Sequence, residues 1–229
     1  MRFSRNRDKM SKLWFYGFVT LVIGCGRAEP PNPAGPATDP AAAFYTLEDR
    51  LLKADTVKFD FHVTAEGALE IDLRGMLDIG PADNIRLTAS GEFAGRPVDL
   101  LLLSEGEEME LGDKTNRATA TSPAHLKEAI VIGLTRMGIL HNLARLMEAS
   151  APDHAEGGVG EWVTVDSFAT AADDPPTLSF DLTVAGQRSG SASLEIDAEG
   201  RPTVRNQTVQ FPSGEMRVVE TYSVVKIQP

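Results

Sequence analysis

The side chains that could perform acid–base, nucleophilic or metal chemistry are scattered along this sequence. The four histidines are His62, His125, His141 and His154. His125 and His141 fall in one predicted helix but sixteen positions apart, too far to share a metal ion. No HExxH or GxSxG motif occurs. With 33 acidic residues, some carboxylates are expected to lie close together by chance, so such a pair would not by itself indicate a catalytic site. We therefore expect a protein that is not an enzyme and that has no cofactor or metal site.

The first 24 residues have the composition of a secretory signal peptide. Five basic side chains come first, Arg2, Arg5, Arg7, Lys9 and Lys12. The apolar run at residues 13–24 (LWFYGFVTLVIG) follows them. Because about 20 apolar residues are needed to span a bilayer core as a helix, this run is too short for a membrane anchor. We predict that residues 1–24 are a cleaved signal peptide.

Cys25 is the only cysteine, and it directly follows Val22-Ile23-Gly24. This stretch resembles the bacterial lipobox, which implies cleavage after Gly24 and lipidation at Cys25. Two or more acyl chains give stable membrane attachment. Gly26 follows the cysteine, as in lipoproteins that are not retained in an inner membrane. The resemblance implies a protein of the cell envelope, anchored by lipid, with its domain in the periplasm or outside the cell. The anchor would lie in the outer membrane if the source has two membranes. The alternative is an ordinary signal peptide with an incidental cysteine.

The Pro/Ala-rich residues 25–43 show no apolar period and predict a tether that carries the lipidated Cys25. Residues 44–229 are then predicted to form one domain. Loss of residues 1–24, with five basic residues and Asp8, changes the formal net charge from −11 to −15. So acidic a chain is not expected to bind nucleic acid or to adhere to anionic lipid through charge.

One long helical pattern lies at residues 122–150, between two groups of strand patterns. Ser122 and Pro123 suit the N-cap and the first helical position. Apolar residues then recur at spacings of three and four and widen beyond one face, so the helix is expected to be buried on most sides. Gly133 and Gly138 predict a kink or a break near Gly138. These glycines either allow close packing or form a hinge over a ligand.

The segments on both sides alternate between apolar and polar residues, as Val57, Phe59, Phe61 and Val63 do. Turn sequences separate them, and about ten strands are predicted. Asp39 and Pro40 predict a short helix before the first strand. The expected fold class is α+β: a curled antiparallel sheet with a central helix or helix pair covering or filling its concave side.

This order of elements, together with the cysteine motif, resembles the LolA/LolB-like superfamily, which includes the LppX and LprG lipoproteins and RseB. Short local sequences are also similar, at residues 47–52 (LEDRLL), 104–109 (SEGEEM) and 196–202 (IDAEGRP). The resemblance covers roughly residues 41–228. It implies an incomplete β-barrel with an apolar cavity that takes acyl chains of lipids or lipoproteins. No arginine among Arg74, Arg86 and Arg136 matches the one that holds the LolA lid shut.

The resemblance implies a carrier or acceptor in lipoprotein sorting or lipid transport. Its partners would be the membrane, a hydrophobic ligand, and another lipoprotein or envelope protein. The expected cavity lining is Phe59, Phe61, Ile71, Leu73, Leu87, Leu134, Met137 and Leu140. The alternative for these residues is a dry core. The alternative function is that of an RseB-like sensory or scaffolding lipoprotein that binds a protein partner.

Overall fold

The computed structural model describes residues 39–147, 159–171, 175–211 and 214–229. The predicted signal peptide, Cys25 and most of the predicted tether therefore lie outside the described residues. The helices are α1 (Pro40–Lys53), α2 (Leu126–Ile132), α3 (Ile139–Met147) and α4 (Val159–Trp162), with a 3-10 turn η1 (Pro81–Asp83) and a π-helical turn η2 (Gly133–Met137). Pro40 to Ala43, which the predicted tether included, are the first turn of α1. The carboxylate of Asp39 caps this helix by accepting the backbone N–H of Ala41 at 3.1 Å.

Eleven strands of the described chain form one antiparallel sheet. They are β1 (Thr56–Gly67), β2 (Ile71–Ile79), β3 (Ile85–Phe93), β4 (Arg96–Glu105), β5 (Glu108–Gly112), β6 (Arg117–Thr121), β7 (Val163–Ala171), β8 (Thr177–Val184), β9 (Gln187–Ile196), β10 (Pro202–Phe211) and β11 (Gly214–Gln228). Their order is β6-β5-β4-β3-β2-β1-β11-β10-β9-β8-β7, so β6 and β7 are the edges and the sheet does not close. The predicted incomplete barrel of about ten strands is confirmed.

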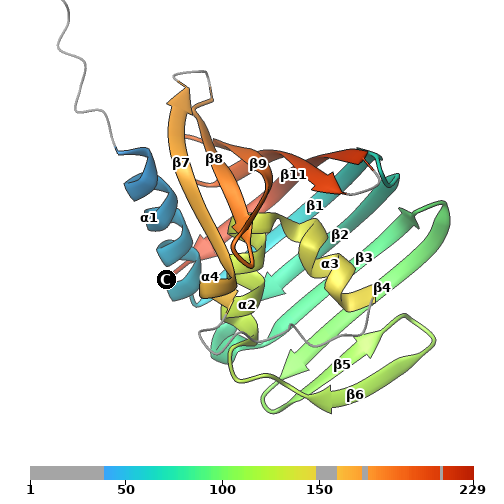
Figure 1. Cartoon of the computed structure of the whole chain (residues 1–229). Coiled ribbons are helices and arrows are strands. Elements are labelled where there is room, and N and C mark those ends of the chain that lie inside the picture. The colour runs from blue at the N-terminus through green and yellow to red at the C-terminus, as the bar shows by residue number, and fades with distance from the viewer. Residues whose placement is uncertain (1–38, 148–158, 172–174, 212–213) are drawn as a thin grey trace, which may run out of the picture. The chain divides into compact units, whose positions relative to one another are not determined.

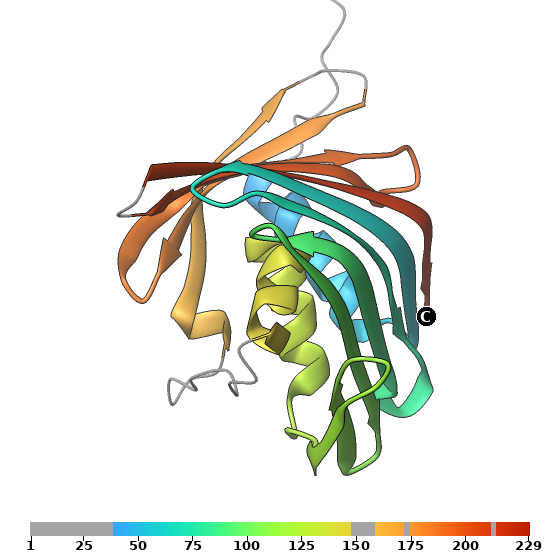
Figure 2. The same ribbon diagram turned by 90° about the vertical axis from the view of Figure 1, so that its right-hand side faces the viewer.

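The sheet curls around the helical segment that comes between β6 and β7 in the chain (Figures 1 and 2). Residues 126–147 lie on the concave side, and α1 packs against α2 and β7. Alternate residues of β1 point inward, and Val57, Phe59, Phe61 and Val63 are at most 4% exposed. The predicted helical segment on the concave side is therefore confirmed.

The helical segment differs from one continuous helix at both predicted features. It begins at Leu126 rather than at Pro123. Ser122 does not cap it, because this residue bonds to β4 and to the turn that follows β4. Its N–H donates to the Glu107 carbonyl at 2.8 Å, and its hydroxyl lies 2.8 Å from that of Ser104. The break predicted near Gly138 is confirmed: this residue has a φ of 88° and separates η2 from α3. Residues with a side chain rarely adopt a backbone conformation with so positive a φ, so glycine is needed there.

No helix in the described ranges is long and apolar enough to cross a membrane.

Candidate functional site

The eight residues predicted to line a cavity are all buried, with exposures of 8% or less. Seven of them belong to one packed apolar cluster between the sheet and the helical segment: Phe59, Phe61, Ile71, Leu73, Leu87, Leu134 and Leu140. Met137 belongs to a second cluster, with Phe44 of α1 and Phe180 of β8. The structure thus brings seven of the eight together. Their role as a ligand site stays a prediction, because these side chains pack against one another.

The strands that carry this cluster approach closely at Gly75 of β2. A Cβ at this position would lie 2.6 Å from the ring of Phe61 and 1.9 Å from the Thr88 carbonyl oxygen. The absence of a side chain therefore lets the Phe61 ring lie over β2. The Phe59 ring in turn packs edge-on against Tyr222 of β11, with ring centroids 5.3 Å apart. The cluster is thus continuous from β2 across β1 to β11.

A buried arginine of β10 holds the end of η2. The guanidinium of Arg205 donates to the carbonyl of Thr135 at 2.9 Å and to the carbonyl of Arg136 at 2.6 Å. Arg205 is only 1% exposed, and burial lowers the pKa of its guanidinium, with the charge of Glu220 opposing that shift. A cation at the carbonyl end of a helix is favourable because the helix dipole is negative there.

A buried glutamate of β11 holds the start of α3. The two carboxylate oxygens of Glu220 accept the backbone N–H groups of Ile139 and Leu140, each at 2.9 Å. An anion at this end of a helix is favourable because its free N–H groups are positive. The Tyr222 hydroxyl donates to the same carboxylate. Burial raises the pKa of the Tyr222 phenol well above its ordinary value, and the charge of Glu220 adds to the shift.

A buried ion pair ties η2 to α1. Arg136 donates to both carboxylate oxygens of Glu48, at 2.9 and 2.7 Å, and Thr135 donates to the same carboxylate at 2.8 Å. Arg136 also donates to the carbonyl of Gly160 in α4 at 2.9 Å. Every side-chain polar atom buried in the described residues has a hydrogen-bond partner. The break in the helical segment is therefore held by polar contacts from α1, α4 and the sheet.

Sequence reasoning missed Arg205, Glu220 and Glu48. A signal for Glu220 was present, because it continues the apolar phase of β11, in which Met216, Val218 and Tyr222 are all buried. A carboxylate on the apolar phase of a strand must find buried partners. Arg205 is its cross-strand neighbour on β10, which only the register of the sheet reveals.

Comparison with known proteins identifies similarity of fold alone. No family model matches the chain, and no curated protein gives a significant match. LprF from Mycobacterium bovis is 11% identical, with a TM-score of 0.40, over 81% of this chain and 92% of LprF. The LolA superfamily protein NE2245 from Nitrosomonas europaea is 10% identical, with a TM-score of 0.37, over 84% of this chain and 95% of NE2245. A DUF1329 family protein from Desulfovibrio piger is 11% identical, with a TM-score of 0.33, over 83% of this chain and 94% of that protein. One of these is thus from the superfamily that the sequence resembles, but similarity this low carries no statement about function.

Proposed function

We propose that this protein is a lipid-anchored protein of the cell envelope that binds acyl chains of a lipid or lipoprotein. The binding site is the interior between the concave face of the sheet and the helical segment. One observation carries the proposal: inward side chains of β1 to β3 and side chains of residues 126–147 form a single apolar cluster. Both walls of this interior are therefore suited to an apolar guest.

An acyl chain enters this interior when the helical segment moves away from the sheet. Exposing apolar surface costs about 25 cal/mol per Å². A bound acyl chain offsets that cost, because each buried methylene contributes about 0.8 kcal/mol. Gly138 is the place where the segment can bend, since its backbone already departs from the helical conformation. The contacts of Arg205 and Glu220 then hold the closed arrangement.

The anchor is proposed from the sequence alone. Cys25 would carry the lipid, and residues 26–37 would connect it to the compact unit Thr38–Pro229. The acidic domain would stay in water, because a negative net charge does not favour adhesion to anionic lipid. Labelling cells with radioactive palmitate tests this step. The wild-type chain should incorporate the label, and Cys25→Ala should not.

The ligand is tested by exporting residues 38–229, without the anchor, into a bacterial periplasm. Native mass spectrometry and lipid extraction should then find an acyl species bound one to one. Leu134→Asp, which places a charge in the apolar cluster, should abolish this binding. Leu103→Asp is the control, because Leu103 of β4 is only partly buried and belongs to neither apolar cluster. Circular dichroism verifies that both variants fold.

A domain that carries no lipid, and takes up none from vesicles, would contradict the proposal. Capture of a stoichiometric envelope protein by such a lipid-free domain would favour the sensory or scaffolding role instead.

A further inference from the structure

The outer face of strands β8 to β11, opposite the apolar clusters, carries polar side chains in two rows. In β8, Leu178, Phe180 and Leu182 are buried, so Ser179 and Asp181 between them lie on the outer face. The pairing of the strands extends these two positions across the sheet. The first row runs through Ser179, Ser193, Asn206 and Val219. The second runs through Asp181, Ser191, Thr208 and Arg217.

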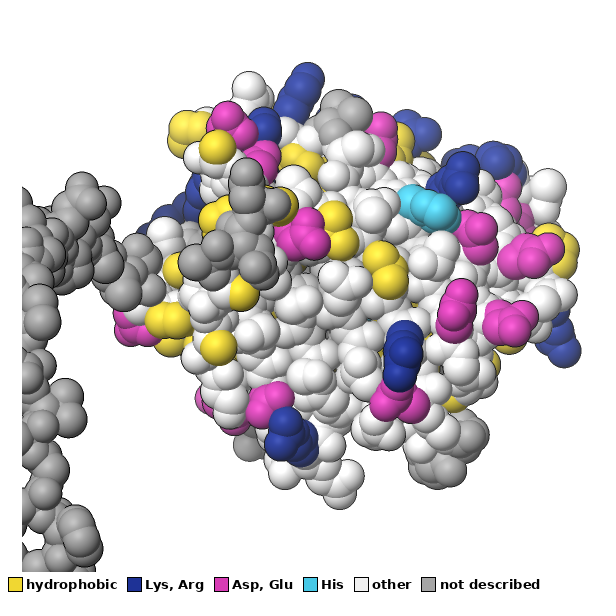
Figure 3. Space-filling model, turned by 90° about the horizontal axis from the view of Figure 1, so that it is seen from above, with side chains coloured by type: hydrophobic (Ala, Val, Ile, Leu, Met, Phe, Trp, Pro, Cys, Tyr) yellow, Lys and Arg dark blue, Asp and Glu magenta, His cyan; other side chains and the backbone are white. Residues whose placement is uncertain are grey.

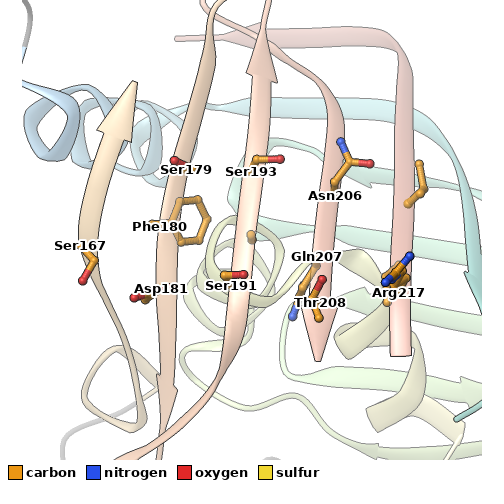
Figure 4. A pocket seen from close by; sticks show the side chains of 13 residues that line it. Ser167, Ser179, Phe180, Asp181, Ser191, Ser193, Asn206, Gln207, Thr208 and Arg217 are labelled. Atoms are coloured by element: carbon orange, nitrogen blue, oxygen red, sulfur yellow. The ribbon is translucent and has the colours of Figure 1, made fainter. Parts of the chain in front are cut away.

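These rows line a groove of about 450 Å³ (Figure 4). Four neighbouring strands at about 4.8 Å spacing make each row roughly 14 Å long. The volume lies within the range of about 300–1,000 Å³ typical of small-molecule sites. Such sites are usually lined by apolar side chains, whereas most of the side chains here carry a hydroxyl or amide group, with carbon atoms forming the larger part of the exposed lining. The groove is therefore suited to a ligand that is itself polar over its length.

The middle of the groove offers hydrogen-bonding groups that the protein leaves unused. Within the described part of the chain, the side chains of Ser191, Ser193, Asn206 and Thr208 make no hydrogen bond or ion pair. Each hydroxyl both donates and accepts, and the Asn206 amide does the same through separate atoms. Ser191 and Asn206 are also well exposed, so a ligand can reach them. This combination matches a ligand rich in hydroxyl groups.

The charges at the two ends of the groove are already neutralised. Asp181 pairs with Arg188 at 2.8 Å, and Arg217 pairs with Glu215 at 2.9 Å. The view of the molecule from above shows mostly uncharged polar side chains and backbone over its central area, with some hydrophobic side chains among them and most charged side chains toward the edges (Figure 3). A charged ligand would find no uncompensated charge in the groove. The exposed Val219 adds an apolar surface on which carbon-bound hydrogens can pack.

We propose that this groove binds a neutral oligosaccharide. The hydroxyl and amide groups of the two rows exchange hydrogen bonds with sugar hydroxyls, and Asp181 and Arg217 contact them at the two ends. The site is separated from the apolar interior by the thickness of the sheet, so it is independent of acyl-chain binding.

The test uses the full chain, purified in a detergent without a sugar head group. Soluble maltotriose, cellotriose, mannotriose and N,N′,N″-triacetylchitotriose are titrated in calorimetry, with trigalacturonic acid as the charged comparison. We expect at least one neutral trisaccharide to bind with a Kd of about 1 mM or lower, and the charged one to bind more weakly. Because the probes carry no acyl chain, their binding does not depend on the interior site.

Variants locate the binding. Ser193→Leu and Thr208→Leu each fill the groove and remove a hydroxyl, so affinity should fall about tenfold or more. Thr208→Ser keeps the hydroxyl and should retain affinity within about threefold. Ser90→Leu makes the same change on an exposed position of β3, outside the groove, and should leave affinity unchanged. Absence of binding to all four sugars, preference for the charged one, or equal affinity in the leucine variants would overturn the proposal.

Discussion

Arg205 and Glu220 face each other across β10 and β11 and bind the two helix ends that meet at Gly138. The cation contacts backbone carbonyls on one side of the break, and the anion contacts backbone N–H groups on the other. A single cross-strand pair thereby fixes where the helical segment turns. The pair is fully buried, so its two charges depend on each other and on the helix ends.

Glu220→Gln should destabilise the domain by about 3 kcal/mol, because an amide NH₂ then replaces one of the two carboxylate oxygens that accept the N–H groups of Ile139 and Leu140, and the negative charge opposite the buried Arg205 is lost. Urea denaturation of residues 38–229 measures the free energy of unfolding. Glu215→Gln, which removes the partner of the exposed Arg217, should change it by no more than about 0.5 kcal/mol. Equal effects of the two substitutions would show that Glu220 does not stabilise the break.

Gly138→Ala should destabilise the domain by more than backbone strain alone. A Cβ at position 138 would lie 2.5 Å from a carboxylate oxygen of Glu220. Gly186→Ala provides the comparison, because Gly186 has a φ of 76° and nothing within 4 Å of such a Cβ. Gly186→Ala should lower the free energy of unfolding by about 1 kcal/mol, because alanine is strained in the left-handed conformation. If Gly138→Ala loses no more unfolding free energy than Gly186→Ala, the Glu220 carboxylate moves aside to make room for the Cβ.

Stability should fall in alkaline solution through Tyr222. Its pKa in the folded state is raised, mainly by burial, so the folded protein holds the phenolic proton more tightly than the unfolded chain. The stabilisation that comes from this raised pKa is fully present below the pKa of the unfolded chain, about 10. It is lost as the pH rises through the pKa of Tyr222 in the folded protein. Tyr222→Phe should therefore show a shallower loss of unfolding free energy above pH of about 10. Tyr45→Phe, which removes an exposed phenol instead, is the control substitution.

The pair formed by Glu48 and Arg136 should be strongly coupled. Glu48→Leu alone leaves a buried guanidinium unpaired and should cost about 3 kcal/mol. The double variant Glu48→Leu/Arg136→Met should cost clearly less than the sum of the two single changes. Urea denaturation of the four proteins in this cycle gives the coupling energy. Additive losses would show that the two side chains act independently.

Local patterns were sufficient to predict ten of the eleven strands, the inward residues of β1 and the break at Gly138. They did not predict β6 (Arg117–Thr121), because all five of its residues are exposed and no apolar alternation marks it. Alternation identified Phe59 and Phe61 as inward, because one face of the sheet is apolar. The start of the helical segment was predicted wrongly, since Ser122 has the right chemistry for a cap but bonds to the β4–β5 region instead.

The pair of Arg205 and Glu220 and the outer groove could not be predicted from local patterns. Both depend on the register between β10 and its neighbours, which places residues far apart in sequence next to each other. Neither a lone arginine nor a lone serine in a strand indicates its cross-strand neighbour. The expected ligand contacts of the eight apolar residues stay a prediction, because a packed cluster has the same sequence pattern as an empty one.

The order of the strands determines when the two halves of the sheet can join. The first strand, β1, pairs with the last, β11, in the middle of the sheet, Val57 lying opposite Ile227. The two halves of the sheet therefore cannot be joined until the final residues have been synthesised. Contacts so distant in sequence form slowly. The facing edges of the two halves, β1 and β11, therefore stay unpaired until late in folding, and their pairing joins the sheet at its centre.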